Sequence, residues 1–400
     1  MLTHAVMAVL GAALATGLLL AFYDPTSGGS GISLPGSGAV PAPGPGSGPL
    51  TGGEQAIVTK IRPGLVIINT TLQYDSEAAA GTGMVINADG LVLTSNHVIN
   101  DSTKITATVP ATGTTYTATV VGYDESGDIA LIQLRNASGL KTVPIGNSAS
   151  VKAGNAVVAL GNAEGRGAIT AKPGRVIALN QTITASEDGG STASETLHGM
   201  IQTNADIVPG DSGGPLASSA GVIGMDTAGN EGNDQQASTG FAIPINTALS
   251  VARQIAGGHA SSAVTIGYPP FVGIFTGSGP DSSPQAQAQQ EQQNGGFSGG
   301  AGNTPQCYTS NSGLTVPSAI APASSGTLII GTICGSPAAS AGMTGGAVIT
   351  AVNGRAVGSP DSLAGILARF HPGDTISVTW VSPSGQRTTS SLHLSAGPPQ

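Results

Sequence analysis

A serine flanked by glycines, in the run DIVPGDSGGPL at residues 206–216, is the first candidate for chemistry. Ser212 follows Gly210 and Asp211 and precedes two more glycines, so the backbone can turn tightly and present the hydroxyl. The same freedom lets the N–H groups of Gly210 and Ser212 converge on one point, where they would stabilise a developing oxygen charge. A serine hydroxyl is a poor nucleophile at neutral pH, however, and needs a base that a carboxylate orients.

His97 and Asp128 are the candidates for that base and that carboxylate. His97 lies in LTSNHVI at the end of an apolar run, and Asp128 directly precedes the apolar run IALIQL. Strand ends are where loops display catalytic side chains. Each residue alone is more often structural, because such a histidine is commonly a surface residue and an aspartate after glycine a turn residue. Together, in the order His97, Asp128 and Ser212, they predict a catalytic triad.

The remaining composition excludes several other kinds of site. The chain has 13 Lys and Arg against 22 Asp and Glu, with a net charge of −9 and no basic cluster. It therefore lacks the electrostatic footprint of a nucleic-acid-binding protein and has no polybasic membrane patch. His198, His371 and His393 have no partner pattern and are read as structural. No spacing typical of metal ligands occurs, so neither a metal nor a cofactor is expected.

Short strands must position the three residues. Alternating or apolar runs bounded by Gly, Asn and Asp recur through residues 65–134, and Asp89-Gly90 is a strong hairpin signal. Such strands predict an antiparallel β-barrel or sandwich. Helical periodicity is scarce before residues 244–257, which we expect to form one helix at the end of this domain.

The first 53 residues have a different character. Residues 1–23 contain an uncharged run from Ala5 to Tyr23, long enough to cross a bilayer as one helix. A membrane anchor is favoured over a cleaved signal peptide, since no Lys or Arg precedes the run. Residues 24–53 consist largely of Gly, Pro, Ser and other small residues and predict a flexible tether. The rest of the chain is then expected outside the cytoplasm, either anchored or secreted.

The last third of the chain predicts a second, smaller domain at residues 258–400. A low-complexity insertion rich in Ser, Gly, Gln and Pro occupies residues 277–306. Residues 359–374 predict a helix with Ser359 as N-cap, followed by strands at 375–381 and 388–394. Cys307 and Cys334 both lie in this domain, where an extracytoplasmic location permits a disulfide and two free thiols are the alternative.

The motifs LTSNHVI, GDIALIQL, GNA, IQTNADIVPGDSGGPL and TGFAIPI resemble, in order and spacing, the trypsin-like serine proteases of the HtrA/Deg type, in particular actinobacterial members. The resemblance covers residues 55–257 within an expected protease domain at 54–257. It implies a mainly β fold, with a chymotrypsin-like double β-barrel followed by a small α+β PDZ domain. It also implies His97 as general base, Asp128 as orienting carboxylate, Ser212 as nucleophile, and an oxyanion loop of Gly210, Asp211 and Ser212.

The end of the chain resembles a bacterial PDZ domain in YPPFVGIF, residues 268–275, and in residues 335–357. That resemblance implies a loop of Phe271, Val272, Gly273 and Ile274 that would bind the terminal carboxylate of a peptide, which would add as a strand. Ala347 stands where the family commonly has an acidic residue. The resemblance also makes a homo-trimer the expected assembly, although no local feature demands one.

Taken together, these motifs predict an extracytoplasmic serine endopeptidase for unfolded or damaged proteins, acting through an acyl-enzyme and regulated or targeted by its PDZ domain. The alternative is a membrane-tethered peptide-binding scaffold or chaperone with a dormant protease fold. No activation site precedes the domain, so Asp211 cannot pair with a newly cleaved N-terminus as in digestive relatives. The polar loop at 185–199 is the expected switch instead. Asp206, six residues before Ser212, is a candidate for an acidic residue at the bottom of the specificity pocket.

Overall fold

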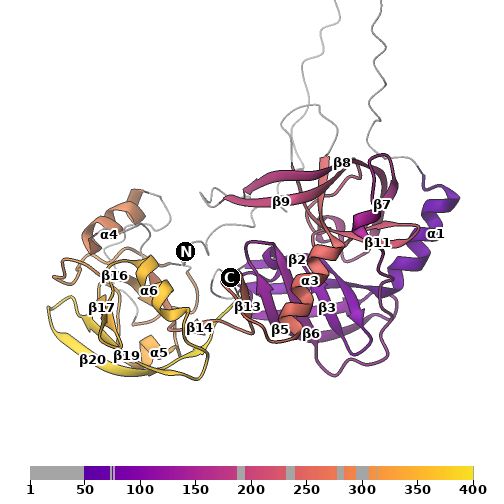
Figure 1. Cartoon of the computed structure of the whole chain (residues 1–400). Helices are drawn as coiled ribbons and strands as arrows, with labels where there is room; N and C mark the ends of the chain where they lie inside the picture. Colours follow the sequence, from indigo (N-terminus) through magenta and orange to yellow (C-terminus); the bar gives the residue numbers. More distant parts are fainter. Residues whose placement is uncertain are drawn as a thin grey trace, which may run out of the picture.

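The computed structural model describes residues 49–72, 74, 77–186, 194–230, 239–276, 283–293, 306–311 and 313–399. Two β-barrels stand together on the right of Figure 1, and a smaller C-terminal domain lies beside the first of them. The predicted fold class, a chymotrypsin-like double barrel followed by a small α+β PDZ domain, is confirmed. Residues 1–23 and nearly all of the expected tether lie outside the described residues.

The first barrel closes because β5 pairs with both β4 and β6. Its ladder runs β5-β4-β1-β2-β3-β6, with β13 added at the outer side of β5. The turn at Asp89-Gly90 joins β2 to β3 as an antiparallel hairpin, as its sequence predicted. The strands are β1 (Leu65–Leu72), β2 (Glu77–Asn87), β3 (Leu91–Thr94), β4 (Lys104–Val109), β5 (Thr114–Asp124), β6 (Ile129–Leu134) and β13 (Val264–Ile266).

The second barrel is a closed ring in the order β10-β11-β12-β9-β8-β7. Alternating strand residues point into an apolar interior that includes Val157, Ile201 and Leu216, each at most 2% exposed. The strands are β7 (Ala156–Gly161), β8 (Thr170–Ser186), β9 (Ser194–Thr203), β10 (Pro215–Ser218), β11 (Gly221–Asn230) and β12 (Thr239–Pro244). The centre of the expected switch loop, residues 187–193, lies outside the described residues.

Helices cover the ends of the double barrel. The predicted C-terminal helix of the protease domain is α3 (Ile245–Ala256), which packs on β5, β6 and β11. A second helix, α1 (Gly52–Ile61), begins inside the segment expected to be tether. It begins there because Thr51 and Glu54 form a reciprocal capping box, with the Thr51 N–H donating to Glu54 Oε2 at 2.7 Å.

The C-terminal domain is one antiparallel sheet with short helices. Its sheet runs β15-β16-β17-β19-β20, with β18 paired to β17, while β14 pairs with β21 outside it. The helix expected over 359–374 is shorter, because it ends at Leu367, but Ser359 is its N-cap as predicted. The elements are β14 (Pro270–Phe271), β15 (Ile274–Thr276), β16 (Thr327–Thr332), α5 (Pro337–Ser340), β17 (Val348–Val352), β18 (Arg355–Ala356), α6 (Pro360–Leu367), β19 (Thr375–Val381), β20 (Arg387–His393) and β21 (Ser395–Ala396).

Part of the low-complexity insertion folds onto this domain. Residues Pro284–Gln293 form helix α4, which packs against β16. The buried amide of Gln287 accepts from the Leu328 N–H at 2.9 Å and donates to the Gly326 carbonyl at 2.8 Å. One glutamine side chain thus satisfies two backbone groups at the start of β16, which the low-complexity sequence does not reveal. Cys307 and Cys334 are joined by a disulfide.

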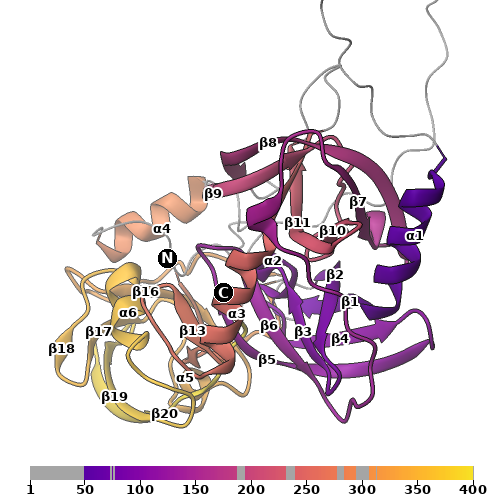
Figure 2. The same cartoon turned by 45° about the vertical axis from the view of Figure 1, so that its right-hand side comes forward.

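The C-terminal domain touches the first barrel, as Figure 2 shows from a second direction. The rings of Tyr74 and Phe271 stack with their centroids 5.7 Å apart. The Asp101 N–H donates to the carbonyl of Pro399 at 2.8 Å, and the hydroxyl of Tyr268 accepts from the Val120 N–H. Within the described part of the chain, no helix has the length and apolarity that crossing a membrane requires.

Candidate active site

His97 and Asp128 meet at one end of the first barrel. His97 belongs to the four-residue helix α2 (Asn96–Ile99), which directly follows β3, and Asp128 lies in the turn that leads into β6. Because β3 and β6 are paired, the two strand ends bring these residues together. His97 Nδ1 is 3.0 Å from both Oδ1 and Oδ2 of Asp128. The contact leaves the opposite ring nitrogen, Nε2, as the one that can act as a base.

Three hydrogen-bond donors converge on the Asp128 carboxylate. Besides His97 Nδ1, they are the His97 backbone N–H at 3.0 Å from Oδ1 and the Thr227 hydroxyl at 2.9 Å from Oδ2. Burial alone would raise the pKa of Asp128, but the charge and hydrogen bonds of His97 and the bond from Thr227 lower it below its ordinary value. Asp128 therefore stays ionised, and its backbone has a positive φ of 50° that aspartate tolerates.

The loop that carries Ser212 is attached to the first barrel. The Ser212 carbonyl accepts from the Thr82 N–H on β2 at 2.9 Å, and Ser212 is 4% exposed. A Cβ atom on Gly213 would overlap the Thr94 hydroxyl and the Thr82 carbonyl, and the φ of Gly213 is +80°. Only glycine lets the loop approach β2 and β3 so closely. The loop that carries Ser212 therefore lies against the end of β3, and His97 follows that strand end in the sequence.

Two backbone donors of this loop are available for an oxyanion. Among the described residues, no acceptor is found for the N–H groups of Gly210 and Ser212. The Asp211 N–H, expected to be a third donor, instead donates to the Val208 carbonyl at 3.0 Å. The Thr82 hydroxyl fixes the loop from the other side by donating to the Gly210 carbonyl at 2.8 Å. The geometry thus offers two oxyanion donors rather than three.

Two buried carboxyl groups lie under the same loop. Asp211 is 1% exposed; its Oδ2 accepts from the Val208 N–H, whereas its Oδ1 has no partner among the described residues. Asp226 on β11 is fully buried, and neither of its carboxyl oxygens finds a partner in the described chain. Burial raises the pKa of Asp211 to about 6 and the pKa of Asp226 well above its ordinary value.

Asp206, the candidate acidic residue at the bottom of a specificity pocket, is paired with a cation. Its Oδ2 lies 3.0 Å from Nζ of Lys172 on β8, and both side chains are 34% exposed. This ion pair reduces the negative charge that Asp206 can offer to a basic substrate side chain.

Sequence reasoning missed Thr82, Lys172, Asp226 and Thr227. Lys172 and Thr227 reach their partners across strands from 34 and 99 residues away in sequence, so no local pattern reveals them. Asp226 did leave a signal, since it is an acid within the apolar run VIGMDTAG. A charge at a strand position that must be buried is a reason to look for function there.

The predicted carboxylate loop is held by its own carbonyl groups. The Gly273 carbonyl accepts from Ile333 N–H and from the Ser336 hydroxyl, each at 3.0 Å, and the Val272 carbonyl accepts from Ala338 N–H. Ile274 begins β15, an edge of the described sheet, so one side of this strand is open to further pairing. Phe271 points away to the first barrel, where it stacks on Tyr74.

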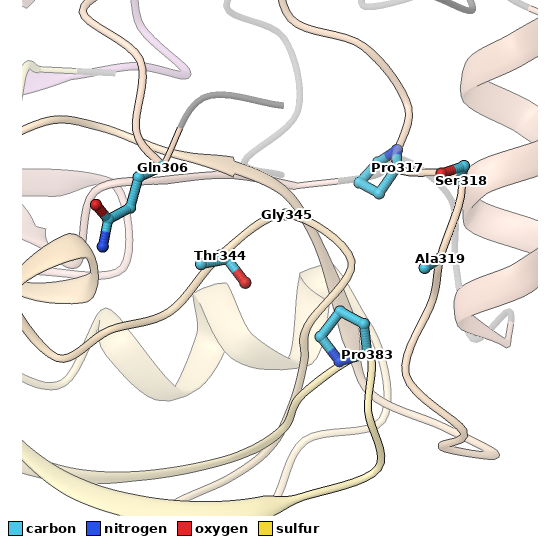
Figure 3. A pocket seen from close by; sticks show the side chains of 7 residues that line it. All are labelled: Gln306, Pro317, Ser318, Ala319, Thr344, Gly345 and Pro383. Carbon is cyan, nitrogen blue, oxygen red and sulfur yellow. The ribbon is translucent and has the colours of Figure 1, made fainter. Parts of the chain in front are cut away.

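The pocket of the C-terminal domain shown in Figure 3 is a weaker candidate for a catalytic site. The pocket in Figure 3 has a volume of about 410 Å³, and no titratable side chain lines it. Its lining residues are Gln306, Pro317, Ser318, Ala319, Thr344, Gly345 and Pro383. In the residues that the structure describes, no cluster of His, Cys, Asp or Glu has the geometry of a metal site. The His97–Asp128 pair, with the Ser212 loop packed on the end of β3, is therefore the candidate catalytic arrangement.

A double β-barrel with a His–Asp contact and a glycine-flanked serine at its seam is the architecture of a trypsin-like serine peptidase. Comparison with known proteins agrees, since the family model described as trypsin-like peptidase domain matches residues 81–225. Serine protease PepD of Mycobacterium tuberculosis is 29% identical over 399 residues, which cover 92% of this chain and 74% of PepD.

The periplasmic pH-dependent serine endoprotease DegQ of Escherichia coli is 39% identical over 177 residues, covering 44% of this chain and only 37% of DegQ. Among solved structures, the HtrA-type protease AlgW with a tripeptide aligns at a TM-score of 0.44 and 23% identity, covering 87% of this chain and 98% of that one. Residues 81–225 thus match a trypsin-like peptidase domain, and the chain is similar to serine proteases of the HtrA/Deg type.

Proposed function

We propose that the protein is an endopeptidase that cleaves peptide bonds through an acyl-enzyme on Ser212. The carrying observation is the placement of His97 Nδ1 at 3.0 Å from both oxygens of the ionised Asp128, beside the loop that presents Ser212. The carboxylate holds the proton on Nδ1, so that Nε2 faces the reaction as a base. His97 keeps a side-chain exposure of 36%, which leaves the ring accessible to a substrate.

The proposed reaction has two halves. Ser212 Oγ attacks the scissile carbonyl carbon while Nε2 of His97 takes the hydroxyl proton, and the carbonyl oxygen becomes an oxyanion. The free N–H groups of Gly210 and Ser212 stabilise that oxyanion. The imidazolium then gives its proton to the leaving amine as the C–N bond breaks. A water molecule, deprotonated by His97, releases the acid and restores Ser212.

The proposed substrates are unfolded or damaged proteins outside the cytoplasm. The disulfide between Cys307 and Cys334 supports an oxidising location, and DegQ is named a periplasmic protease. Anchoring through residues 1–23, or secretion after their removal, belongs to the same proposal. Assembly as a homo-trimer is also proposed, and light scattering on the purified protein would measure it.

Regulation or targeting by the PDZ domain is the remaining part. A peptide C-terminus would bind at the loop of Phe271, Val272, Gly273 and Ile274 and add as a strand to the open side of β15. Because Phe271 stacks on Tyr74 of the first barrel, an occupied loop has a direct contact through which to influence the protease domain. Titration of the protein with C-terminal peptides, with hydrolysis as the readout, tests this part.

The central proposal is tested by labelling with a serine-reactive fluorophosphonate. We expect covalent labelling of the native protein, its complete loss in Ser212→Ala, and hydrolysis of an unfolded protein substrate by the unsubstituted chain alone. Asp361→Asn, a change on an exposed helix start of the C-terminal domain, is the matched control and should label normally. Absence of labelling with and without an activating peptide would favour the dormant scaffold instead.

A further inference from the structure

The carboxyl group of Asp211 lies in an unusual electrostatic setting. It is buried between the two oxyanion donors, Gly210 and Ser212, and one of its oxygens has no partner in the described chain. Of the charged groups that act on it, Asp206 and Glu164 are acids and Lys172 alone is a cation. An ionised Asp211 would therefore depend on one lysine for its counter-charge.

Lys172 reaches this region from the neighbouring strands of the second barrel. It lies on β8 opposite Ala159 of β7, two residues before Gly161. A Cβ atom on Gly161 would lie 2.5 Å from both Cα and Oδ1 of Asp211, so β7 packs directly on the aspartate. The ammonium group of Lys172 bonds Asp206 at 3.0 Å, and its charge also acts on Asp211 and lowers the pKa of that carboxyl group.

Close packing around Asp211 prevents its carboxylate from moving away from the neighbouring negative charges. Gly161 packs against the carboxylate on one side. The residues after Asp211 are fixed by the backbone of Asp226, whose carbonyl accepts from the Gly213 N–H at 2.8 Å and whose N–H donates to the Gly214 carbonyl at 2.7 Å. Arg166 is paired with Glu164, and Lys172 remains the cation that acts on Asp211. An unfavourable charge on Asp211 must therefore be relieved by moving the loop itself, and with it the two oxyanion donors.

We propose that Lys172 is a positioning residue whose ammonium group balances the Asp211 carboxylate, and so keeps the N–H groups of Gly210 and Ser212 in the oxyanion-binding arrangement. Asp206 competes for the same ammonium group and sets how much of its charge Asp211 receives. In acid, a proton on Asp211 replaces the need for Lys172. Above pH 6, where Asp211 ionises, the arrangement depends on the lysine.

This inference rests on the proposed function, because the readout is the reactivity of Ser212. Lys172→Met keeps the length of the side chain and removes its charge. Relative to the unsubstituted protein, we expect kcat to fall about tenfold at pH 8, the effect of one pKa unit, and to change little at pH 5.5, with KM unchanged. Lys172→Arg should restore most of the activity at pH 8, which a purely steric role would not predict.

Asp206→Asn is the matched variant, for which the expected change in the pH 8 to pH 5.5 activity ratio is opposite to that of Lys172→Met. It frees the ammonium group for Asp211, so the pH 8 to pH 5.5 activity ratio should rise rather than fall. In an Asp211→Asn background, which carries no charge to balance, Lys172→Met should cause no further pH-dependent loss. Melting curves for each variant show whether the protein is folded at both pH values.

Each outcome decides the matter. Equal losses for Lys172→Met at both pH values, or a loss that persists in full beside Asp211→Asn, would overturn the inference while leaving the protease assignment intact. If Asp211→Asn is itself inactive, the opposite pH responses of the Lys172 and Asp206 variants decide, and responses of the same sign refute it. Failure of the unsubstituted protein to label at Ser212 would instead refute the proposed function.

Discussion

Replacing Asp128 by asparagine tests the proposed triad most directly. The Asp128 carboxylate accepts from His97 Nδ1, from the His97 N–H and from the Thr227 hydroxyl. An asparagine has one accepting oxygen and one donating NH₂ group. The His97 N–H, 3.0 Å from Oδ1, keeps the amide oxygen at that position, so the NH₂ group takes the Oδ2 position, 3.0 Å from Nδ1. It therefore favours the tautomer with the proton on Nε2, which cannot accept a proton from Ser212.

The size of the loss follows from the contacts removed. The ionised carboxylate is fully buried, so its hydrogen bonds are not weakened by water. Losing the charge-assisted bonds to His97 Nδ1 and to Thr227 costs about 1.5–3 kcal/mol each, or roughly two to four powers of ten in kcat when both act in the transition state. We expect kcat for a chromogenic peptide to fall in that range, with KM nearly unchanged.

Thr227→Val separates the two contributions. It removes one bond to the carboxylate and leaves both the charge and the His97 contacts, so its loss in kcat should not exceed about a hundredfold. Fluorophosphonate labelling rates should follow the same order, with Asp128→Asn slower than Thr227→Val. If folded Asp128→Asn retained more than a tenth of the native kcat, the assignment of Asp128 as orienting carboxylate would be refuted.

Three further predictions concern stability and the nucleophile loop. Gly213→Ala places a methyl group on the Thr94 hydroxyl at a positive φ, so labelling should fall at least a hundredfold, measured against Gly113→Ala at an open turn. Asp226→Asn should gain stability over the native chain as pH rises above about 4: burial raises the pKa of Asp226, so the native protein is stabilised when this group is protonated and loses that stabilisation as the group ionises. The gain should reach at least about 2–4 °C in Tm at pH 8, and a pH-independent difference would contradict it. Reducing the Cys307–Cys334 bond, which closes a separation of 27 residues, should cost the C-terminal domain about 3–4 kcal/mol in urea unfolding while initial labelling of the protease domain stays unchanged.

Local signals predicted the elements of the fold where turns and caps decide them. Asp89-Gly90 makes a hairpin and Ser359 caps a helix because both effects act within a few residues. Helix α1 was missed although Thr51 and Glu54 carry the spacing of a capping box, since the glycines between them suggested tether. Helix α4 was missed because Gln287 is ordered by backbone groups about forty residues further on.

In the candidate site, too, residues with local sequence signals were predicted and residues with long-range contacts were not. The proposed triad residues His97, Asp128 and Ser212 lie at strand ends and in a glycine turn, positions that residue type and order can indicate. Thr227 and Lys172 act across the barrels, and their roles depend on pairings that only the closed sheets create. The Asp211 N–H, expected as a third oxyanion donor, donates to the Val208 carbonyl inside the turn, a pairing that only the folded loop reveals.

Asp211 requires a counter-charge, and both the sequence and the structure limit where that charge can come from. The chain has no activation site to supply a new amino terminus, so a carboxylate beside the nucleophile needs another source of positive charge. With 13 basic residues against 22 acids, and two more acids, Asp206 and Glu164, acting on the same group, that source is scarce. A proton or Lys172 must supply it. In the proposed mechanism the oxyanion donors Gly210 and Ser212 flank Asp211 directly, so the group that supplies the positive charge would also determine whether the active site is assembled.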